Sequence, residues 1–110
     1  MHIADVFARH DTTFSFEFFP PKTAEAWERL LASMRELELL GPSFVSVTYG
    51  AGGTTRANTH ELVLQIRSRT NLLPVPHLTA VCHTRDDVWS MLDDYAQNGI
   101  SNVMALMGDP

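Results

Sequence analysis

Short apolar runs alternate along the chain with longer segments in which apolar residues recur at every third or fourth position. The short runs predict β-strands, and the longer segments predict amphipathic helices. We expect a lead-in or a short terminal helix in residues 1–12. The expected strands are 13–19, 44–48, 75–81 and 101–107, and the expected helices lie within 23–40, 54–71 and 84–98.

Prolines and capping residues mark several of these boundaries. The first strand ends at Pro20–Pro21, because proline cannot donate to a sheet ladder, and Pro76 suits only the beginning of the third strand. Thr23 is a suitable N-cap for the first long helix. Thr84, followed by Asp87, resembles a capping box in which aspartate replaces glutamate.

Strands that alternate with helices in this way must run parallel, because each helix returns the chain to the same end of the sheet. Two parallel architectures compete, the doubly wound open sheet and the closed barrel. A doubly wound nucleotide-binding fold carries its glycine-rich turn after the first strand, whereas here the glycines at 50–53 follow the second strand. The pattern favours a barrel of the TIM type. Since a full barrel needs about 250 residues, we expect residues 1–110 to form one segment, the first half, with about four strands and three helices and no second domain.

Composition and charge exclude several classes of protein. The formal net charge is −5 without a basic cluster, which argues against nucleic acid or a membrane surface as a partner. A single cysteine, Cys82, excludes an intramolecular disulfide, and no metal-ligand spacing surrounds it, so no metal site is expected. With neither a membrane-span pattern nor a signal-peptide pattern, a cytoplasmic protein is the default expectation.

Candidate reactive side chains collect where the expected strands end, which is where barrels of this type carry their active sites. Glu17 is the most informative, because strand alternation places it on the face opposite Phe16 and Phe18. The phenylalanine face suits packing against helices, so Glu17 is expected to point into the barrel. A carboxyl group shielded from water tends to keep its proton and can act as a general acid. The alternative is a glutamate paired with a nearby arginine or lysine.

The other candidates carry stronger structural alternatives. Asp109 lies in a Gly-Asp-Pro sequence that forms turns, and His77 can be a hydrogen-bonded core residue. The glycine-rich turn at 50–53 lacks the P-loop lysine and the Rossmann spacing. It suits a tight turn near a flat ligand better than a phosphate loop.

Together these segments resemble the amino-terminal half of the methylenetetrahydrofolate reductase family, from Thr13 to the last residue. The motifs are FSFEFFPPK at 14–22, FVSVTYGAGG at 44–53, PHLT at 76–79, NGI at 98–100 and ALMGDP at 105–110. The resemblance implies a (β/α)8 barrel that binds FAD at the strand carboxyl ends. It also implies that NADH or NADPH reduces the flavin, which reduces 5,10-methylenetetrahydrofolate to 5-methyltetrahydrofolate in one-carbon metabolism and methionine biosynthesis.

The resemblance also implies roles for single residues. Glu17 matches the acid that helps to open the five-membered ring of the folate, and Asp109 matches an aspartate near the flavin and the folate. Thr48 matches a residue beside the nicotinamide and the flavin. Further flavin-contact positions are matched by Tyr49, Ala51, His77 and Gly108.

Two departures from the family pattern matter. Met107 stands where the family commonly has arginine, which removes a cation and its forked donors and leaves a backbone contact at that cofactor position. Half a barrel also leaves two open sheet edges, which predicts poor stability, self-association or a homo-oligomer. Two alternatives to the reductase therefore remain: a truncated, non-catalytic remnant or association module, and a barrel enzyme that uses Glu17 and Asp109 as an acid–base pair without flavin.

Overall fold

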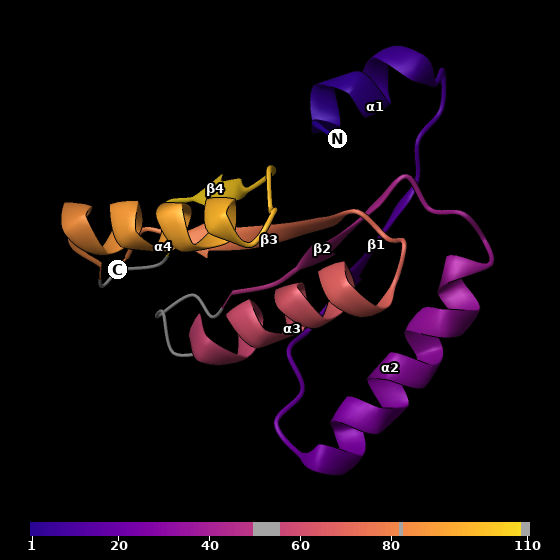
Figure 1. Ribbon diagram of the computed structural model, residues 1–110, viewed down its shortest axis with the longest axis horizontal. Coiled ribbons are helices and arrows are strands. Elements are labelled where there is room, and N and C mark those ends of the chain that lie inside the picture. The colour runs from indigo at the N-terminus through magenta and orange to yellow at the C-terminus, as the bar shows by residue number, and fades with distance from the viewer. Residues whose placement is uncertain (50–55, 82, 109–110) are drawn as a thin grey trace.

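The computed structural model describes residues 1–49, 56–81 and 83–108, and strands and helices alternate along them (Figure 1). The strands are β1 (Ser15–Phe18), β2 (Phe44–Val47), β3 (Pro74–Thr79) and β4 (Met104–Leu106). The helices are α1 (Ile3–Arg9), α2 (Ala24–Glu38), α3 (Arg56–Arg69) and α4 (Arg85–Gln97). The predicted order of strands and helices is confirmed, and the lead-in forms the short terminal helix α1.

The four strands form one parallel sheet in the order β1-β2-β3-β4. Spatial order therefore follows sequence order, whereas a doubly wound sheet reverses direction after its first strands. This sheet and its crossover helices have the architecture of the first half of a TIM-type barrel, as the sequence predicts. The register sets Glu17 opposite Ser46 and His77 opposite Met104.

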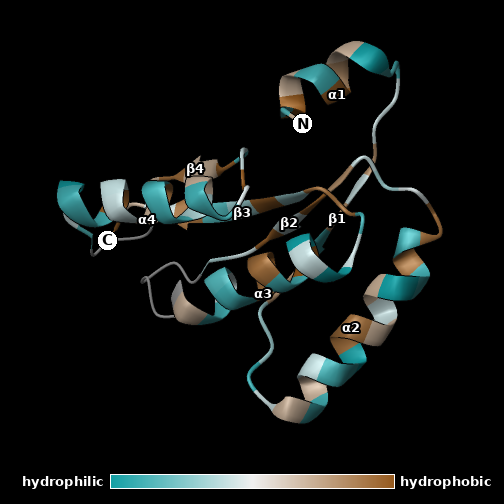
Figure 2. Ribbon diagram, in the orientation of Figure 1, coloured by the Kyte–Doolittle hydropathy of each residue, from teal (hydrophilic) through white to brown (hydrophobic). Residues whose placement is uncertain are grey.

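Three helices bury one face of the sheet. Val45 and Val47 of β2 are fully buried against Met34 of α2 and Leu62 and Ile66 of α3. The hydrophobic colour in Figure 2 runs along much of β2 and β3, while hydrophilic colour dominates α4. Each buried side chain of this kind contributes about 1.5–3 kcal/mol relative to exposure, so this layer supplies the main stabilisation.

The opposite face of the sheet carries no helix among the described residues, and we call it the inner face. Alternation along the strands assigns to it Glu17, Ser46, His77, Thr79, Met104 and Leu106. This face is polar towards β1 and apolar towards β4, where Met104 and Leu106 are 37% and 40% exposed.

Two helices begin at the predicted caps. The Thr23 hydroxyl accepts a hydrogen bond from the backbone N–H of Ala26 at 3.1 Å. At α4 the Thr84 hydroxyl accepts from the N–H of Asp87 at 3.1 Å, and the Asp87 carboxylate accepts from the N–H of Thr84 at 2.9 Å. This is the capping box that the sequence predicts, and it fixes where the loop after β3 ends.

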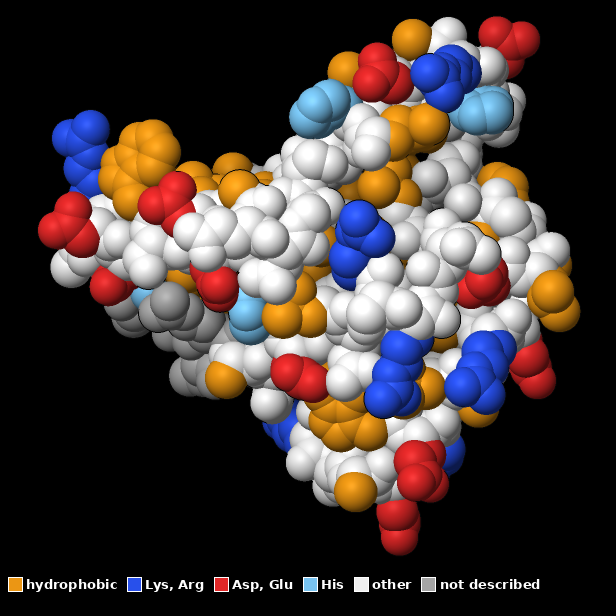
Figure 3. All heavy atoms as spheres, viewed as in Figure 1, with side chains coloured by type: hydrophobic (Ala, Val, Ile, Leu, Met, Phe, Trp, Pro, Cys, Tyr) orange, Lys and Arg blue, Asp and Glu red, His pale blue; other side chains and the backbone are white. Residues whose placement is uncertain are grey.

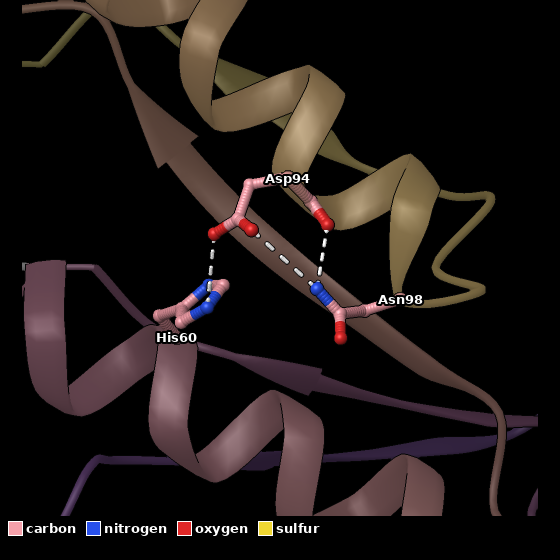
Figure 4. Close-up of polar contacts among 3 residues, drawn as sticks. All are labelled: His60, Asp94 and Asn98. Atoms are coloured by element: carbon pink, nitrogen blue, oxygen red, sulfur yellow. Dashed lines mark hydrogen bonds and ion pairs between the residues drawn. The ribbon is translucent and has the colours of Figure 1, made fainter.

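A polar contact joins α3 to α4 (Figure 4). His60 Nε2 lies 3.0 Å from Asp94 Oδ2, and Asn98 Nδ2 donates to the Asp94 carbonyl at 2.8 Å. The His60 and Asp94 side chains are 31% and 53% exposed, so this ion pair contributes at most about 1 kcal/mol. On the face of the molecule drawn in Figure 3, acidic and basic side chains are interspersed.

Helix α1 is fastened at the amino ends of the strands. The N–H of Ile3 donates to Asn102 Oδ1 at 2.8 Å, and Asn102 Nδ2 donates to the Met1 carbonyl at 2.8 Å. The Phe7 ring packs edge-on against Phe44 at the start of β2, with 6.2 Å between centroids. The opposite end of the sheet therefore remains available for a site.

All four strands are shorter than the sequence predicts, and two of the differences have a structural explanation. Strand β4 covers only Met104–Leu106 of the expected 101–107, because Asn102 bonds instead to the α1 region. Pro76 is the third residue of β3 rather than its start. Backbone N–H groups along a strand point alternately to its two neighbours. The N–H of Ala80 points to β4, where it donates to Leu106, so position 76 is also one whose N–H would point to β4. Since β4 pairs only from His77 onward, no ladder bond is lost.

Candidate functional site

Most of the predicted site residues lie at the carboxyl end of the sheet. Glu17 is near the end of β1, Thr48 and Tyr49 directly follow β2, and His77 lies in the second half of β3. Met107 and Gly108 directly follow β4. Ala51 and Asp109 lie outside the described residues.

The Glu17 carboxylate contacts two side chains of the inner face through the same oxygen. Its Oε1 accepts a hydrogen bond from Ser46 Oγ at 3.0 Å and lies 3.1 Å from His77 Nε2. Three neighbouring strands thus bring one polar group each to one point. Both contacts involve Oε1, and neither involves Oε2.

The expected shielding of Glu17 from water is not what the structure shows. Its side chain is 50% exposed, and its partners are Ser46 and His77 rather than the arginine or lysine of the alternative. The physical reason is the position of Glu17 on β1, which is an edge strand of the described sheet, so one side of its side chain has no neighbouring strand. The direction of the side chain, towards the inner face, is as expected.

His77 is a buried residue whose ring nitrogen has unused hydrogen-bonding capacity. The residue is 9% exposed, and Nε2 is buried. Although Nε2 lies 3.1 Å from Glu17 Oε1, it has no described partner at hydrogen-bonding angles. The two groups are therefore close without forming a hydrogen bond. They form an ion pair only when the imidazole is protonated and the carboxyl group is ionised.

The end of β2 is tied to its neighbours through the backbone of Thr48. Its N–H donates to the Phe18 carbonyl at 3.0 Å, and its carbonyl accepts from the Thr59 hydroxyl of α3 at 2.8 Å. The next residue, Tyr49, is 7% exposed, and its hydroxyl lies 2.6 Å from His83 Nε2. These contacts hold the rim of the site in place between β1 and the loop after β3.

A shallow apolar hollow of about 370 Å³ lies at the ends of β3 and β4, lined by Ala80, Val81, Met107 and Gly108. Gly108 has a φ of +87°, and a Cβ there would overlap the Thr79 side chain and lie 2.7 Å from Val81 Cγ1. Only glycine fits this backbone without strain. The Met107 side chain is 84% exposed, and its carbonyl accepts from the N–H of Val81 at 3.2 Å.

Comparison with known proteins identifies the family. The family model described as methylenetetrahydrofolate reductase matches residues 2–110. The chain belongs to the methylenetetrahydrofolate reductase family.

Curated relatives agree with this assignment. The chain is 47% identical over 95 residues to a 5,10-methylenetetrahydrofolate reductase of Salmonella typhimurium and 46% identical over 95 residues to that of Escherichia coli. Both alignments cover 86% of this chain and 32% of the relative. A plant relative, methylenetetrahydrofolate reductase (NADH) 1 of Arabidopsis thaliana, is 39% identical over 108 residues, which are 98% of this chain and 18% of the relative. The chain thus spans about a third of the length of these bacterial methylenetetrahydrofolate reductases.

Two structural findings bear on other classes of site in this chain. Within residues 1–49, 56–81 and 83–108, no helix is long and apolar enough to cross a membrane. Among the same residues, no group of three or more His, Cys, Asp or Glu side chains is placed to hold a metal ion.

Two residues of the site region received no functional role from the sequence. Ser46 is a small polar residue between two fully buried valines. The register of β1 and β2 places its side chain on the same face of the sheet as that of Glu17. His83 contacts Tyr49 across 34 positions of sequence. Ser46 carries a weak local signal, a serine inside an apolar strand, whereas nothing local marks His83.

Proposed function

We propose that this chain forms the amino-terminal part of a flavin-dependent reductase that converts 5,10-methylenetetrahydrofolate to 5-methyltetrahydrofolate, with NADH or NADPH as reductant. The observation that carries the proposal is the Glu17 carboxyl group, hydrogen-bonded to Ser46 and 3.1 Å from His77 Nε2 on the inner face of a chain of this family. The name of the Arabidopsis thaliana relative includes NADH, which supports a nicotinamide reductant.

The residues at the carboxyl end of the sheet fit a flavin. The hollow beside Gly108 is apolar and open, as a flat ring system requires, and His77 Nε2 is a buried polar atom without a described hydrogen bond. We assign the flavin contacts to Thr48, Tyr49, His77, the backbone of Met107, and Gly108. When bound, FAD supplies a two-electron carrier between the nicotinamide and the folate.

In this proposal Glu17 is the general acid. Its carboxyl group delivers a proton to the folate as the five-membered ring opens, which makes the departing nitrogen a better leaving group. Ser46 donates to Oε1 and keeps that oxygen an acceptor, so the proton to be delivered sits on Oε2. His77, close to the same oxygen, limits rotation of the carboxyl group.

The roles of Asp109 and Ala51 in this proposal rest on the resemblance alone. Asp109 is the residue directly after Gly108 in the sequence. We assign it the aspartate position near the flavin and the folate, where a negative charge stabilises positive charge that develops on the substrate.

A specific observation favours a second candidate function, a non-catalytic association module. Strands β1 and β4 each pair with only one strand of the described sheet, and the inner face exposes Met104 and Leu106. Open parallel edges with apolar neighbours invite pairing with another chain.

The visible spectrum of the purified chain with added FAD separates these candidates. A shifted flavin band that bleaches on addition of NADH or NADPH supports the reductase proposal. Absence of flavin binding together with association of the chain supports the module. Turnover of a substrate without flavin contradicts both.

A further inference from the structure

The shortest side-chain contact at the rim of the candidate site involves a histidine without an assigned role. The Tyr49 hydroxyl lies 2.6 Å from His83 Nε2, and the two rings meet edge-on with centroids 5.8 Å apart. The contact connects the end of β2 with the loop between β3 and α4.

Both partners are held by their own surroundings. Tyr49 is 7% exposed and follows directly after Thr48, whose backbone is bonded to β1 and α3. The N–H of His83 donates to the Ala80 carbonyl at 3.2 Å, and the next residue, Thr84, caps α4. Because both side chains start from fixed backbone, little conformational entropy is lost when the hydrogen bond forms.

The direction of this hydrogen bond depends on the tautomer of His83, and we assign the Tyr49 hydroxyl as the donor. A tyrosine hydroxyl is a good donor, and a neutral imidazole accepts through the nitrogen that carries no hydrogen. Donation by Tyr49 to Nε2 therefore places the His83 proton on Nδ1. The Tyr49 hydroxyl is thus tied to the loop after β3, and the buried ring has its polar end fixed.

We propose that His83 is a positioning residue of the flavin site, which acts by holding the Tyr49 hydroxyl and with it the chain at the end of β2. This inference rests on the proposed function, in which Tyr49 is a flavin contact. His83 itself touches neither flavin nor folate. Its effect on flavin affinity must therefore pass through Tyr49.

A double-mutant cycle on the complete chain tests that route. The dissociation constant for FAD is measured from shifts in ¹H–¹⁵N spectra for the wild type, His83→Ala, Tyr49→Phe and the double variant. Loss of one buried hydrogen bond weakens FAD binding about five- to tenfold in either single variant. The double variant binds no more weakly than Tyr49→Phe, because His83 has nothing left to hold.

Two further variants separate positioning from a general loss of fold. His83→Gln places an acceptor near the position of Nε2 and restores binding to within about twofold of the wild type. His10→Ala, a histidine on the exposed end of α1, leaves FAD binding unchanged. Long-range ¹H–¹⁵N correlations of His83 show one tautomer, with the proton on Nδ1, in the wild type and a mixture in Tyr49→Phe.

The outcomes distinguish this inference from the proposed function. FAD binding that is indifferent to His83→Ala, or an equal loss in the Tyr49→Phe background, overturns the inference and leaves the proposed function intact. A His83 tautomer that does not respond to Tyr49→Phe also overturns it. A wild-type chain that binds no FAD contradicts the flavin assignment itself and overturns the inference with it.

Discussion

Ser46 donates a hydrogen bond to one oxygen of Glu17, which in the proposed mechanism leaves the other oxygen to deliver the proton. Its hydroxyl, 5% exposed, donates to Oε1 over 3.0 Å, and no water competes easily for a donor that is so well buried. The substitution Ser46→Ala removes the donating hydroxyl group and leaves a methyl side chain that the strand can accommodate. Ser46 therefore offers a test of the acid that does not alter the acid.

Ser46→Ala is expected to slow folate reduction about tenfold while reduction of the flavin by NADH or NADPH changes less than about twofold. The measurement requires a chimaera in which this chain replaces the matching segment of the Escherichia coli relative, so that both half-reactions are followed. Ser15→Ala, an exposed serine at the start of β1, is the control and leaves both rates unchanged. Equal slowing of both half-reactions by Ser46→Ala would contradict the assigned role.

Gly108→Ala is expected to destabilise the chain by about 3 kcal/mol, because the new Cβ overlaps Thr79 and the backbone has positive φ. Gly41→Ala is the matched control, since Gly41 has a φ of +64° with nothing within 4 Å of the added carbon. It should cost only the conformational strain, about 1 kcal/mol. Urea unfolding followed by circular dichroism gives both values, and equal losses would show that the crowding at Gly108 is unimportant.

Sequence reasoning reached the direction of Glu17 but not its surroundings. Alternation along an aromatic strand is a local property, so the face of Glu17 followed from Phe16 and Phe18. The partners Ser46 and His77 depend on the register of three strands, which no local pattern specifies. The exposure of Glu17 was predicted wrongly, because the argument assumed a closed barrel around it.

At the scale of the elements, the capping box sets where α4 begins and where the preceding loop can carry His83. Thr84→Ala removes the hydroxyl that accepts from Asp87 and is expected to cost about 1 kcal/mol of folding free energy. Thr84→Ser retains the acceptor and should cost little. A chain that loses equal stability with alanine and with serine would contradict the capping argument.

The helices and strands themselves were largely predictable, because the spacing of apolar residues and the identity of capping residues are local properties of the sequence. All four strands and the three long helices were expected, with α2 and α4 capped by Thr23 and Thr84 as predicted. The misplaced boundaries have tertiary causes. Asn102 bonds to the α1 region instead of extending β4, and Pro76 is accommodated because its neighbour strand starts later.

At the scale of the whole molecule, the sheet has two strand edges without a described partner and an inner face that is partly apolar. The chain should therefore associate as its concentration rises, with a mass above that of the monomer in sedimentation velocity. Leu106→Lys places a charge on β4 and the inner face and should shift the chain towards the monomer. Leu39→Lys, at an 88% exposed leucine beyond α2, should not.

The association prediction can fail in two ways. A folded wild-type monomer at all concentrations would show that the open edges are harmless. Association that both lysine variants weaken equally would locate it outside β4.

The central claim is that Glu17 delivers the proton for folate reduction, and Glu17→Gln in the chimaera with the Escherichia coli relative tests it most directly. Glutamine keeps the shape of the side chain and its contact with Ser46 but has no acidic proton. The account predicts that NADH or NADPH still reduces the flavin at close to the wild-type rate, while reduction of 5,10-methylenetetrahydrofolate stops. Folate reduction at the wild-type rate in Glu17→Gln would contradict it.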